Sequence, residues 1–296
     1  MSKLTIACVQ TNTKPDPLDN IAEVGAMIRE AKAQGADLIT TPEVVGMMCA
    51  NREEALTRAR PEETHEVLAA FRDLAVELKA WLLIGSISIK LSDDKLANRS
   101  FLIDPDGDIV ARYTKIHMFD VQVGDGTLYR ESYTYQPGEE AVLAETPWGT
   151  VGLTICYDIR FPYLFRDLAQ AGARLIFSPA AFTKATGEAH WHVLQRARAI
   201  ENGCFIVSPA QTGTHAGGRQ TYGHSVVVTP WGEVLSDGGT DPGIYLSEID
   251  LAAVDSARGK IPSLTHDRSY SPPVTATENV GDWRLKSAVS SWKVAR

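Results

Sequence analysis

Short apolar runs that alternate with amphipathic stretches constrain the fold of this chain more than any other feature. We expect strands at residues 4–10, 37–41, 81–89, 99–104, 108–113, 151–155, 175–178, 205–208, 223–229 and 244–249. Helices with one apolar face are expected at residues 20–34, 64–79, 165–171 and 188–202. The segments 105–107 and 230–233 are typical of hairpin turns. Together these patterns predict an α/β protein with a mixed sheet.

The arrangement of these elements stays open at this level. Four helices with one apolar face each need sheet surface to cover. Two sheets stacked face to face and a single doubly wound sheet satisfy this need equally well. Because no linker-like segment interrupts the pattern, we predict one domain, residues 1–265. Residues 266–296 form a tail that we expect to wrap a dimer partner or to stay loose.

Composition excludes several classes of function. A net charge of −8 with interspersed signs makes nucleic acid an unsuitable partner. No run approaches the roughly 18 apolar residues of a membrane span. Four cysteines without a CxxC spacing, and a start without a signal-like segment, predict a cytoplasmic, reduced protein without disulfides. The histidines are scattered without a chelating pattern, so we expect no metal site.

Three polar residues stand where apolar strands end. Cys156 follows residues 151–155, Glu43 follows 37–41 across a proline, and Lys115 follows 108–113. Cysteines are usually small buried hydrophobes, and charged strand ends are usually solvated. Taken together, however, a carboxylate, an ammonium and a thiol supply a base, an oxyanion stabiliser and a nucleophile for acyl transfer. We expect burial to raise the pKa of the glutamate and the ammonium to lower the pKa of the thiol.

The chain resembles the nitrilase superfamily of carbon–nitrogen hydrolases. The resemblance runs from residue 6 to residue 262, and its most specific segments are residues 41–43, 113–120, 152–162, 187–202 and 222–225. It implies a four-layer α-β-β-α sandwich and a homodimer that packs through helices near the site. It also implies hydrolysis of a linear carboxamide to a carboxylate and ammonia through a Glu-Lys-Cys triad and a thioester, without a metal or organic cofactor.

The resemblance assigns roles to particular residues. Glu43 is the general base, Lys115 stabilises the intermediate and Cys156 is the nucleophile. A second family glutamate corresponds to Glu131, rather than to Glu139 or Glu140, and positions the lysine or the attacking water. The backbone N–H of Tyr157 is expected to be the second oxyanion donor.

The residues around the nucleophile narrow the range of candidate substrates. The Cys-Tyr-Asp-Ile-Arg-Phe-Pro sequence at 156–162 resembles the Nit branch, whose ω-amidases act on amides of α-keto acids. Residues 210–215 and 222–225 are similar to members that hydrolyse deaminated glutathione; the alternative substrates are 2-oxoglutaramate and 2-oxosuccinamate. All are small anionic amides. Arg160 is the candidate for binding their carboxylate, with a salt bridge to Asp158 or Asp167 as an equal alternative.

Other features keep ordinary or open interpretations. Arg196 and Arg198 are expected to form ion pairs that hold the fold. The glycine-rich loop at 212–220 is either a lid or a plain surface loop. An acyltransferase, which passes the acyl group to an amine, is the alternative enzyme class. A binding protein without catalysis is the third possibility, and the intact triad positions count against it.

Overall fold

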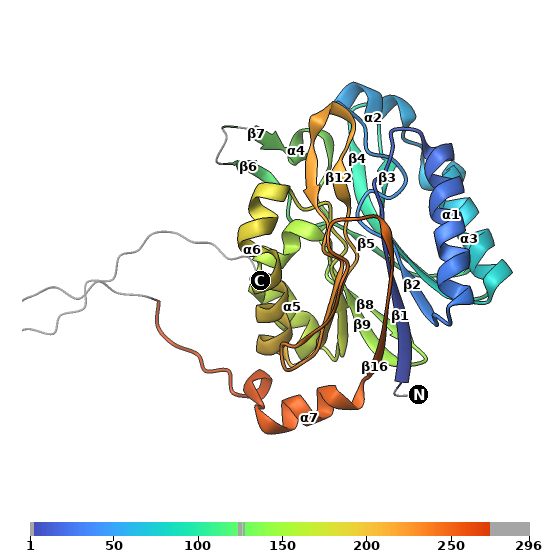
Figure 1. The fold of residues 1–296 in the computed structure, drawn as a ribbon. Coiled ribbons are helices and arrows are strands. Elements are labelled where there is room, and N and C mark those ends of the chain that lie inside the picture. Colours follow the sequence, from blue (N-terminus) through green and yellow to red (C-terminus); the bar gives the residue numbers. More distant parts are fainter. Residues whose placement is uncertain (1–2, 124–125, 127, 273–296) are drawn as a thin grey trace, which may run out of the picture. The chain divides into compact units, whose positions relative to one another are not determined.

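Two six-stranded sheets form the centre of the molecule (Figure 1). The computed structural model describes residues 3–123, 126 and 128–272. The chain divides into two units, residues 1–264 and 265–296, and the first contains both sheets. Across the first sheet the order is β16 (Gly243–Asp250), β1 (Lys3–Gln10), β2 (Leu38–Thr40), β3 (Trp81–Lys90), β4 (Leu96–Ile103), β5 (Ile109–Thr114). Across the second it is β15 (Val234–Asp237), β14 (Val226–Val228), β11 (Phe205–Ser208), β10 (Leu175–Phe177), β9 (Gly149–Leu153), β8 (Val142–Thr146).

Helices cover the outer faces of both sheets (Figure 1). These helices are α1 (Pro17–Ala33), α3 (Glu66–Leu78), α5 (Pro162–Gln170) and α6 (Lys184–Asn202). The other helices are α2 (Arg52–Arg58), α4 (Glu131–Thr134) and α7 (Ala252–Lys260), and the 3₁₀ turns are η1 (Glu62–Thr64), η2 (Cys156–Arg160), η3 (Ala216–Gly218) and η4 (Ser263–Thr265). Two small ribbons pair β6 (Asp120–Gln122) with β7 (Leu128–Arg130) and β12 (Thr212–Thr214) with β13 (Gln220–Tyr222).

Strand β1 shows how the layers are filled. Successive side chains of a strand point to opposite faces. Ile6 and Cys8 belong to the core that includes Leu153 of the second sheet, whereas Ala7 and Val9 belong to the core formed with α1 and α3. The first sheet is therefore buried on both faces, which explains its nearly continuous apolar runs. The fold is the expected α-β-β-α sandwich, and the single doubly wound sheet is wrong.

Local differences from the predicted elements have physical reasons. Helix α2 was not predicted because none of its residues is buried, so it carries no apolar stripe. Strand β4 begins at Leu96 rather than at 99, which places Asn98 inside a strand. Helix α5 begins at Pro162, since proline suits the first turn of a helix. No helix in the described part of the chain is long and apolar enough to cross a membrane.

The directions of the strands determine where the catalytic candidates meet. Strand β2 pairs in parallel with β3, and two successive antiparallel pairings lead from β3 to β5. The carboxyl ends of β2 and β5 therefore lie at the same edge of the first sheet. The segment after β2 passes very close to β3: a Cβ atom at Gly85 would lie 2.0 Å from the carbonyl oxygen of Thr41. Only glycine allows this path, which leads directly to Glu43.

Candidate active site

The three predicted catalytic side chains meet in one cavity. Glu43 follows β2, Lys115 follows β5 directly, and Cys156 begins η2 after β9. Their exposed fractions are 4%, 2% and 6%, so all three are buried. They line a cavity of about 240 Å³ together with Glu131 and Tyr157. The topology thus brings four predicted side chains and the predicted oxyanion residue to one place.

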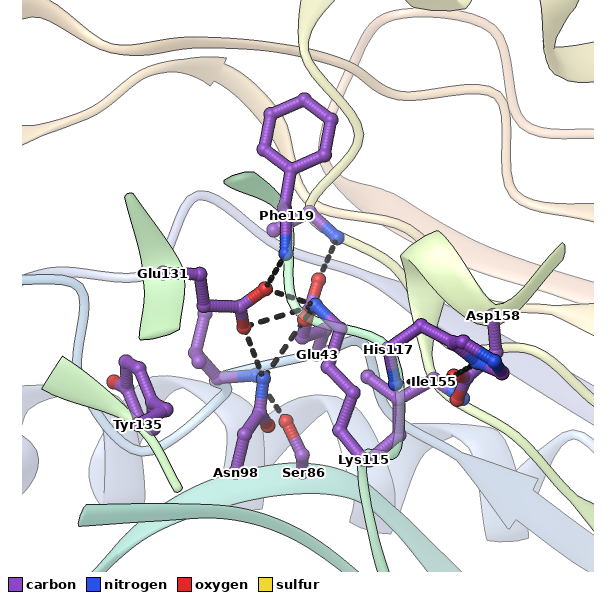
Figure 2. A network of polar contacts seen from close by, with 12 residues as sticks. Glu43, Ser86, Asn98, Lys115, His117, Phe119, Glu131, Tyr135, Ile155 and Asp158 are labelled. Atoms are coloured by element: carbon purple, nitrogen blue, oxygen red, sulfur yellow. Dashed lines mark hydrogen bonds and ion pairs between the residues drawn. The ribbon is translucent and has the colours of Figure 1, made fainter. Parts of the chain in front are cut away.

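Lys115 lies between two carboxylates (Figure 2). Its Nζ donates to Glu43 Oε1 at 2.8 Å and to both oxygens of Glu131 at 2.9 Å. Asn98 donates from Nδ2 to Glu43 Oε1 at 2.9 Å, and the backbone N–H of Ala181 donates to Glu43 Oε2 at 2.7 Å. Lysine and both carboxylates are therefore held by several hydrogen bonds, as buried charges require. Sequence reasoning missed Asn98 because the predicted strand began one residue after it.

Charge determines the protonation of this group. Burial alone would lower the pKa of Lys115, but the charges of Glu131 and Glu43 raise that pKa well above its ordinary value. Burial alone would raise the pKa of Glu43, yet Lys115, and to a lesser extent Arg219, bring it below 4.5. The expectation of a raised pKa for Glu43 is therefore wrong. The pKa of Glu43 is lowered because the ammonium of Lys115, 2.8 Å away, outweighs the effect of burial.

The thiol of Cys156 sits at a strained point of the backbone. Cys156 has a φ of +49°, a left-handed conformation that a non-glycine residue adopts only where its surroundings hold it. Its N–H donates to the carbonyl of Pro179 at 2.9 Å. Burial and the charge of Glu43 raise the pKa of the thiol well above 9, although Lys115 acts in the opposite direction. The expected net lowering is wrong, so the resting thiol is protonated.

Asp158 joins the nucleophile turn to the strand that carries the lysine. It is fully buried. Its Oδ2 accepts hydrogen bonds from the hydroxyl of Tyr113 at 2.7 Å and the N–H of Ile155 at 2.8 Å. Its Oδ1 accepts from the N–H of His117 at 3.1 Å and lies 2.7 Å from the Nδ1 atom of His117 (Figure 2). Because Tyr113 and His117 flank Lys115 in the chain, this carboxylate sets the position of Cys156 relative to the lysine.

Tyr157 and Arg160 lie on η2 but face different surroundings. Tyr157 is the second residue of η2, where a backbone N–H has no acceptor within the helix. Arg160 is not among the described residues that line the cavity. Its Nη2 lies 3.3 Å from His190 Nδ1, and its guanidinium carbon lies 5.3 Å from the ring centroid of Phe182. A role for Arg160 in binding the substrate carboxylate stays a prediction.

The two arginines of α6 behave differently from each other. Arg198 is buried and forms the expected ion pair with Glu201 at 3.0 Å. It also donates from Nε to the carbonyl of Ile159 at 2.8 Å, so it holds the end of the nucleophile turn. Arg196 makes no ion pair in the described part of the chain, so that expectation is wrong for this residue; its Nε donates to the carbonyl of Gly232 at 2.8 Å instead. Both side chains therefore hold the fold through backbone carbonyls.

The glycine-rich loop at 212–220 forms part of the cavity wall. It is the β12–β13 ribbon with η3 at its tip, and it brings Arg219 to the cavity. Arg219 donates from Nη2 to the carbonyl of Ala181 at 2.7 Å. The same Ala181 donates its N–H to Glu43, so the guanidinium lies beside the catalytic group. Sequence reasoning missed Arg219 because an isolated arginine in a polar loop has no periodic signal.

Two histidines that looked scattered in the sequence meet around one carboxylate. The Nε2 atom of His192 lies 2.9 Å from Asp237 Oδ2, and the Nδ1 atom of His224 lies 2.8 Å from Oδ1. The three ligand atoms lie within 4.8 Å of one another, which is metal-ligand spacing. The contacts tie α6 to the β14–β15 hairpin, outside the catalytic cavity.

Comparison with known proteins identifies the family. A family model described as carbon–nitrogen hydrolase matches residues 5–259. This chain belongs to the carbon–nitrogen hydrolase family. The deaminated glutathione amidase of Yersinia enterocolitica is 38% identical over 274 residues, which are 92% of this chain and 95% of the relative. The protein is therefore a hydrolase of carbon–nitrogen bonds and a Nit-type amidase, in agreement with the resemblance of the sequence to the nitrilase superfamily.

Solved structures agree with this family. The NitFhit protein of Caenorhabditis elegans superposes with a TM-score of 0.85 at 35% identity, covering 94% of this chain and 69% of that one. A glutamate-to-glutamine mutant of an amidase from Nesterenkonia superposes with a TM-score of 0.75 at 25% identity, covering 88% of this chain and 95% of that one. In that structure the acetamide moiety of fluoroacetamide is added covalently to the active-site cysteine.

Proposed function

We propose that this amidase cleaves a linear amide through a thioester on Cys156, with deaminated glutathione as its substrate. The observation that carries the proposal is the position of Lys115. Its Nζ lies within 2.9 Å of both Glu43 and Glu131 in the cavity that the thiol faces. The covalent acetamide on the cysteine of the Nesterenkonia enzyme supports a cysteine nucleophile.

The first half of the reaction forms the acyl-enzyme. Glu43 takes the proton from Cys156 as the sulfur attacks the amide carbon, because a thiol with a raised pKa is not a thiolate at rest. Lys115 and the N–H of Tyr157 stabilise the oxyanion of the tetrahedral intermediate. The carbon–nitrogen bond then breaks, and the leaving amine takes the proton from the Glu43 acid. A thioester remains on Cys156.

The second half hydrolyses the thioester. Glu43, ionised again, takes a proton from water as its oxygen attacks the acyl carbon. Collapse of the second tetrahedral intermediate expels the sulfur, which regains the proton from Glu43, and the product leaves as a carboxylate. Glu131 contacts no reacting atom in this scheme. It holds the ammonium of Lys115 in place through both of its oxygens.

The substrate proposal rests on the relatives and on chemistry. The Yersinia relative is named for deaminated glutathione. This compound has no primary carboxamide, so its cleavage releases the amine of cysteinylglycine rather than the ammonia that a simple carboxamide yields. The competing ω-amidase substrate, 2-oxoglutaramate, does release ammonia.

Turnover of the two substrates tests the proposal. We expect purified protein to hydrolyse deaminated glutathione with a kcat/KM about tenfold or more above that for 2-oxoglutaramate, about 1.4 kcal/mol in transition-state binding. The assay follows 2-oxoglutarate, the product common to both. Adding hydroxylamine should divert part of the product to hydroxamate, since a thioester is open to amines. Cys156→Ala should abolish both products, and unchanged turnover in that variant would overturn the mechanism.

The homodimer remains a separate proposal. Val193 and Ile200 stand seven residues apart on one side of α6 and are 69% and 51% exposed, and Tyr163 of α5 is 57% exposed. Burial of this face between two copies fits the expected packing through helices. Light scattering coupled to gel filtration measures the mass directly, and a monomer at assay concentration would exclude the dimer. The proposed contact with a partner concerns the tail of residues 266–296, of which residues 273–296 lie outside the described residues.

A further inference from the structure

Two arginines that line the same cavity each have a buried Nε–H without a partner in the described part of the protein. Within the described ranges, the Nε atoms of Arg52 and Arg219 are buried without a hydrogen-bond partner in the protein. Both residues line the cavity that contains Glu43 and Cys156. A buried cationic donor without an acceptor is costly, so each position is built for an acceptor that comes from outside the chain.

Arg219 lies next to the reacting groups. Its Nη2 is bound to the carbonyl of Ala181, the residue whose N–H holds Glu43, and its charge acts on the pKa of Glu43. The loop behind it is fixed: the N–H of His215 donates to the carbonyl of Arg219 at 2.8 Å. The ring of His215 lies 2.7 Å from Thr221 Oγ1. The guanidinium is therefore held in place before any ligand binds.

Arg52 lies farther from the triad, at the start of α2. Its Nη2 donates to the carbonyl of Asp94 at 2.7 Å, and its guanidinium carbon lies 4.5 Å from the ring centroid of Tyr133. Tyr133 is 64% exposed, so this arginine stands at the solvent side of the cavity wall. Its Nη2, like that of Arg219, is anchored on a backbone carbonyl, and its Nε points to no acceptor in the described part of the protein.

The free edge of each guanidinium suits a carboxylate. Arginine binds carboxylates through two parallel N–H groups, and in this chain Arg29 does so with Nε and Nη2 on Glu77, at 2.7 and 2.8 Å. In Arg52 and Arg219, Nε makes no hydrogen bond in the described part of the protein and Nη2 makes one to a backbone carbonyl, so the Nε–Nη2 edge of each still has two hydrogens for a carboxylate. One carboxylate would sit near Cys156 and the other near solvent.

We propose that the cavity selects amides with a carboxylate on each side of the scissile bond, binding the acyl-side carboxylate at Arg219 and the amine-side carboxylate at Arg52. The proposal rests on the amide hydrolysis proposed above and extends it to substrate selection. Deaminated glutathione carries both carboxylates, one on its 2-oxoglutaryl part and one on its terminal glycine. 2-Oxoglutaramate carries only the first. Arg219 should therefore contribute to the binding of both substrates, and Arg52 to the binding of deaminated glutathione alone.

Binding to an inactive protein tests the proposal without turnover. In a Cys156→Ala background, calorimetry compares the dissociation constants of deaminated glutathione and 2-oxoglutaramate for Arg219→Gln and Arg52→Gln. A lost charge-assisted pair corresponds to roughly a 10- to 100-fold weakening. We expect Arg219→Gln to weaken both ligands by this factor, and Arg52→Gln to weaken deaminated glutathione alone. Thermal unfolding confirms that each variant is folded, and Arg52→Lys and Arg219→Lys should restore part of the affinity.

Controls separate this inference from the proposed function. Arg29→Gln removes a matched exposed arginine outside the cavity and should leave both dissociation constants unchanged. Equal effects of Arg52→Gln on both ligands, or no effect of either cavity variant, would overturn the inference. A loss of affinity in Arg160→Gln, with Arg219→Gln unaffected, would instead support the residue expected from the sequence. Failure of the wild-type protein to cleave either compound would refute the proposed function and leave the binding result to decide the inference.

Discussion

Two buried carboxylates, Glu43 at the end of β2 and Asp158 in the nucleophile turn, look alike by burial but differ in what surrounds them. Their exposed fractions are 4% and 0%, and both accept several hydrogen bonds. Asp158 is surrounded by a phenol, two backbone N–H groups and an imidazole. Glu43 is bound by the ammonium of Lys115 and interacts with the thiol of Cys156, which can give up a proton. The identity of the donors, rather than burial, distinguishes a carboxylate that reacts from one that holds the structure.

Removing the charge of Glu43 should have the largest effect on catalysis. Glu43→Gln keeps the shape of the side chain but cannot accept the thiol proton, so we expect kcat/KM to fall by about 10²–10⁴-fold. The unfolding temperature should also fall, because the new amide N–H₂ meets the donors that bind Glu43, whereas Lys115 keeps Glu131 as its partner. The measurement is steady-state kinetics beside a thermal melt. Activity within about tenfold of wild type would show that Glu43 is not the base.

Removing the charge of Asp158 should mainly affect stability. Asp158→Asn places an amide N–H₂ among groups that donate hydrogen bonds, and we expect the free energy of unfolding to fall by about 2–3 kcal/mol. Urea denaturation measures this loss. Tyr113→Phe, which removes one donor to the same carboxylate, should cost about 1 kcal/mol. If Asp158→Asn instead left stability intact and abolished turnover in the folded protein, the contrast with Glu43 would fail.

The reactivity of the resting thiol gives a smaller but sharper test. Because the pKa of Cys156 lies well above 9, the rate of its alkylation by iodoacetamide should be low at pH 7 and still rise up to tenfold per pH unit above pH 9. Peptide mapping separates it from Cys49, whose pKa burial raises to about 11. The pKa of Glu43, in contrast to that of Cys156, is shifted downward, to below 4.5. Activity should therefore be lost through protonation of Glu43 only as the pH falls through that lower value. A plateau in the alkylation rate below pH 8 would mean a resting thiolate.

The sequence was sufficient to predict which residues stand at the strand ends, but not the contacts that these residues make with one another. Glu43, Lys115 and Cys156 follow apolar runs that are visible locally, and parallel strand directions bring such ends together. The sign of the pKa shift of Glu43 depends on an ammonium 2.8 Å away, contributed by another strand. No local pattern contains that distance, so burial alone led to the wrong sign.

Residues that act across the fold were missed for the same reason. Asp158 is next to the nucleophile in the sequence, but its partners Tyr113 and His117 come from the other sheet's edge. Arg219 reaches the cavity on a short polar ribbon without an apolar stripe. Arg160, chosen for its closeness to Cys156 in the chain, is not among the described cavity residues. Closeness in sequence to Cys156 does not predict which residues line the cavity, because the side chains of a 3₁₀ helix point in different directions.

The ribbon of β12 and β13 has a consequence for how such an enzyme can diversify. It carries Arg219 but none of the triad, and α2, which carries Arg52, is likewise separate from the strand ends that hold the reacting groups. Exchange of α2 would alter the ligands that are accepted without changing the contacts of the triad, whereas exchange of the ribbon would also change the charge that lowers the pKa of Glu43. Grafting these two segments between relatives is thus a route to new amidase specificities on an unchanged sandwich.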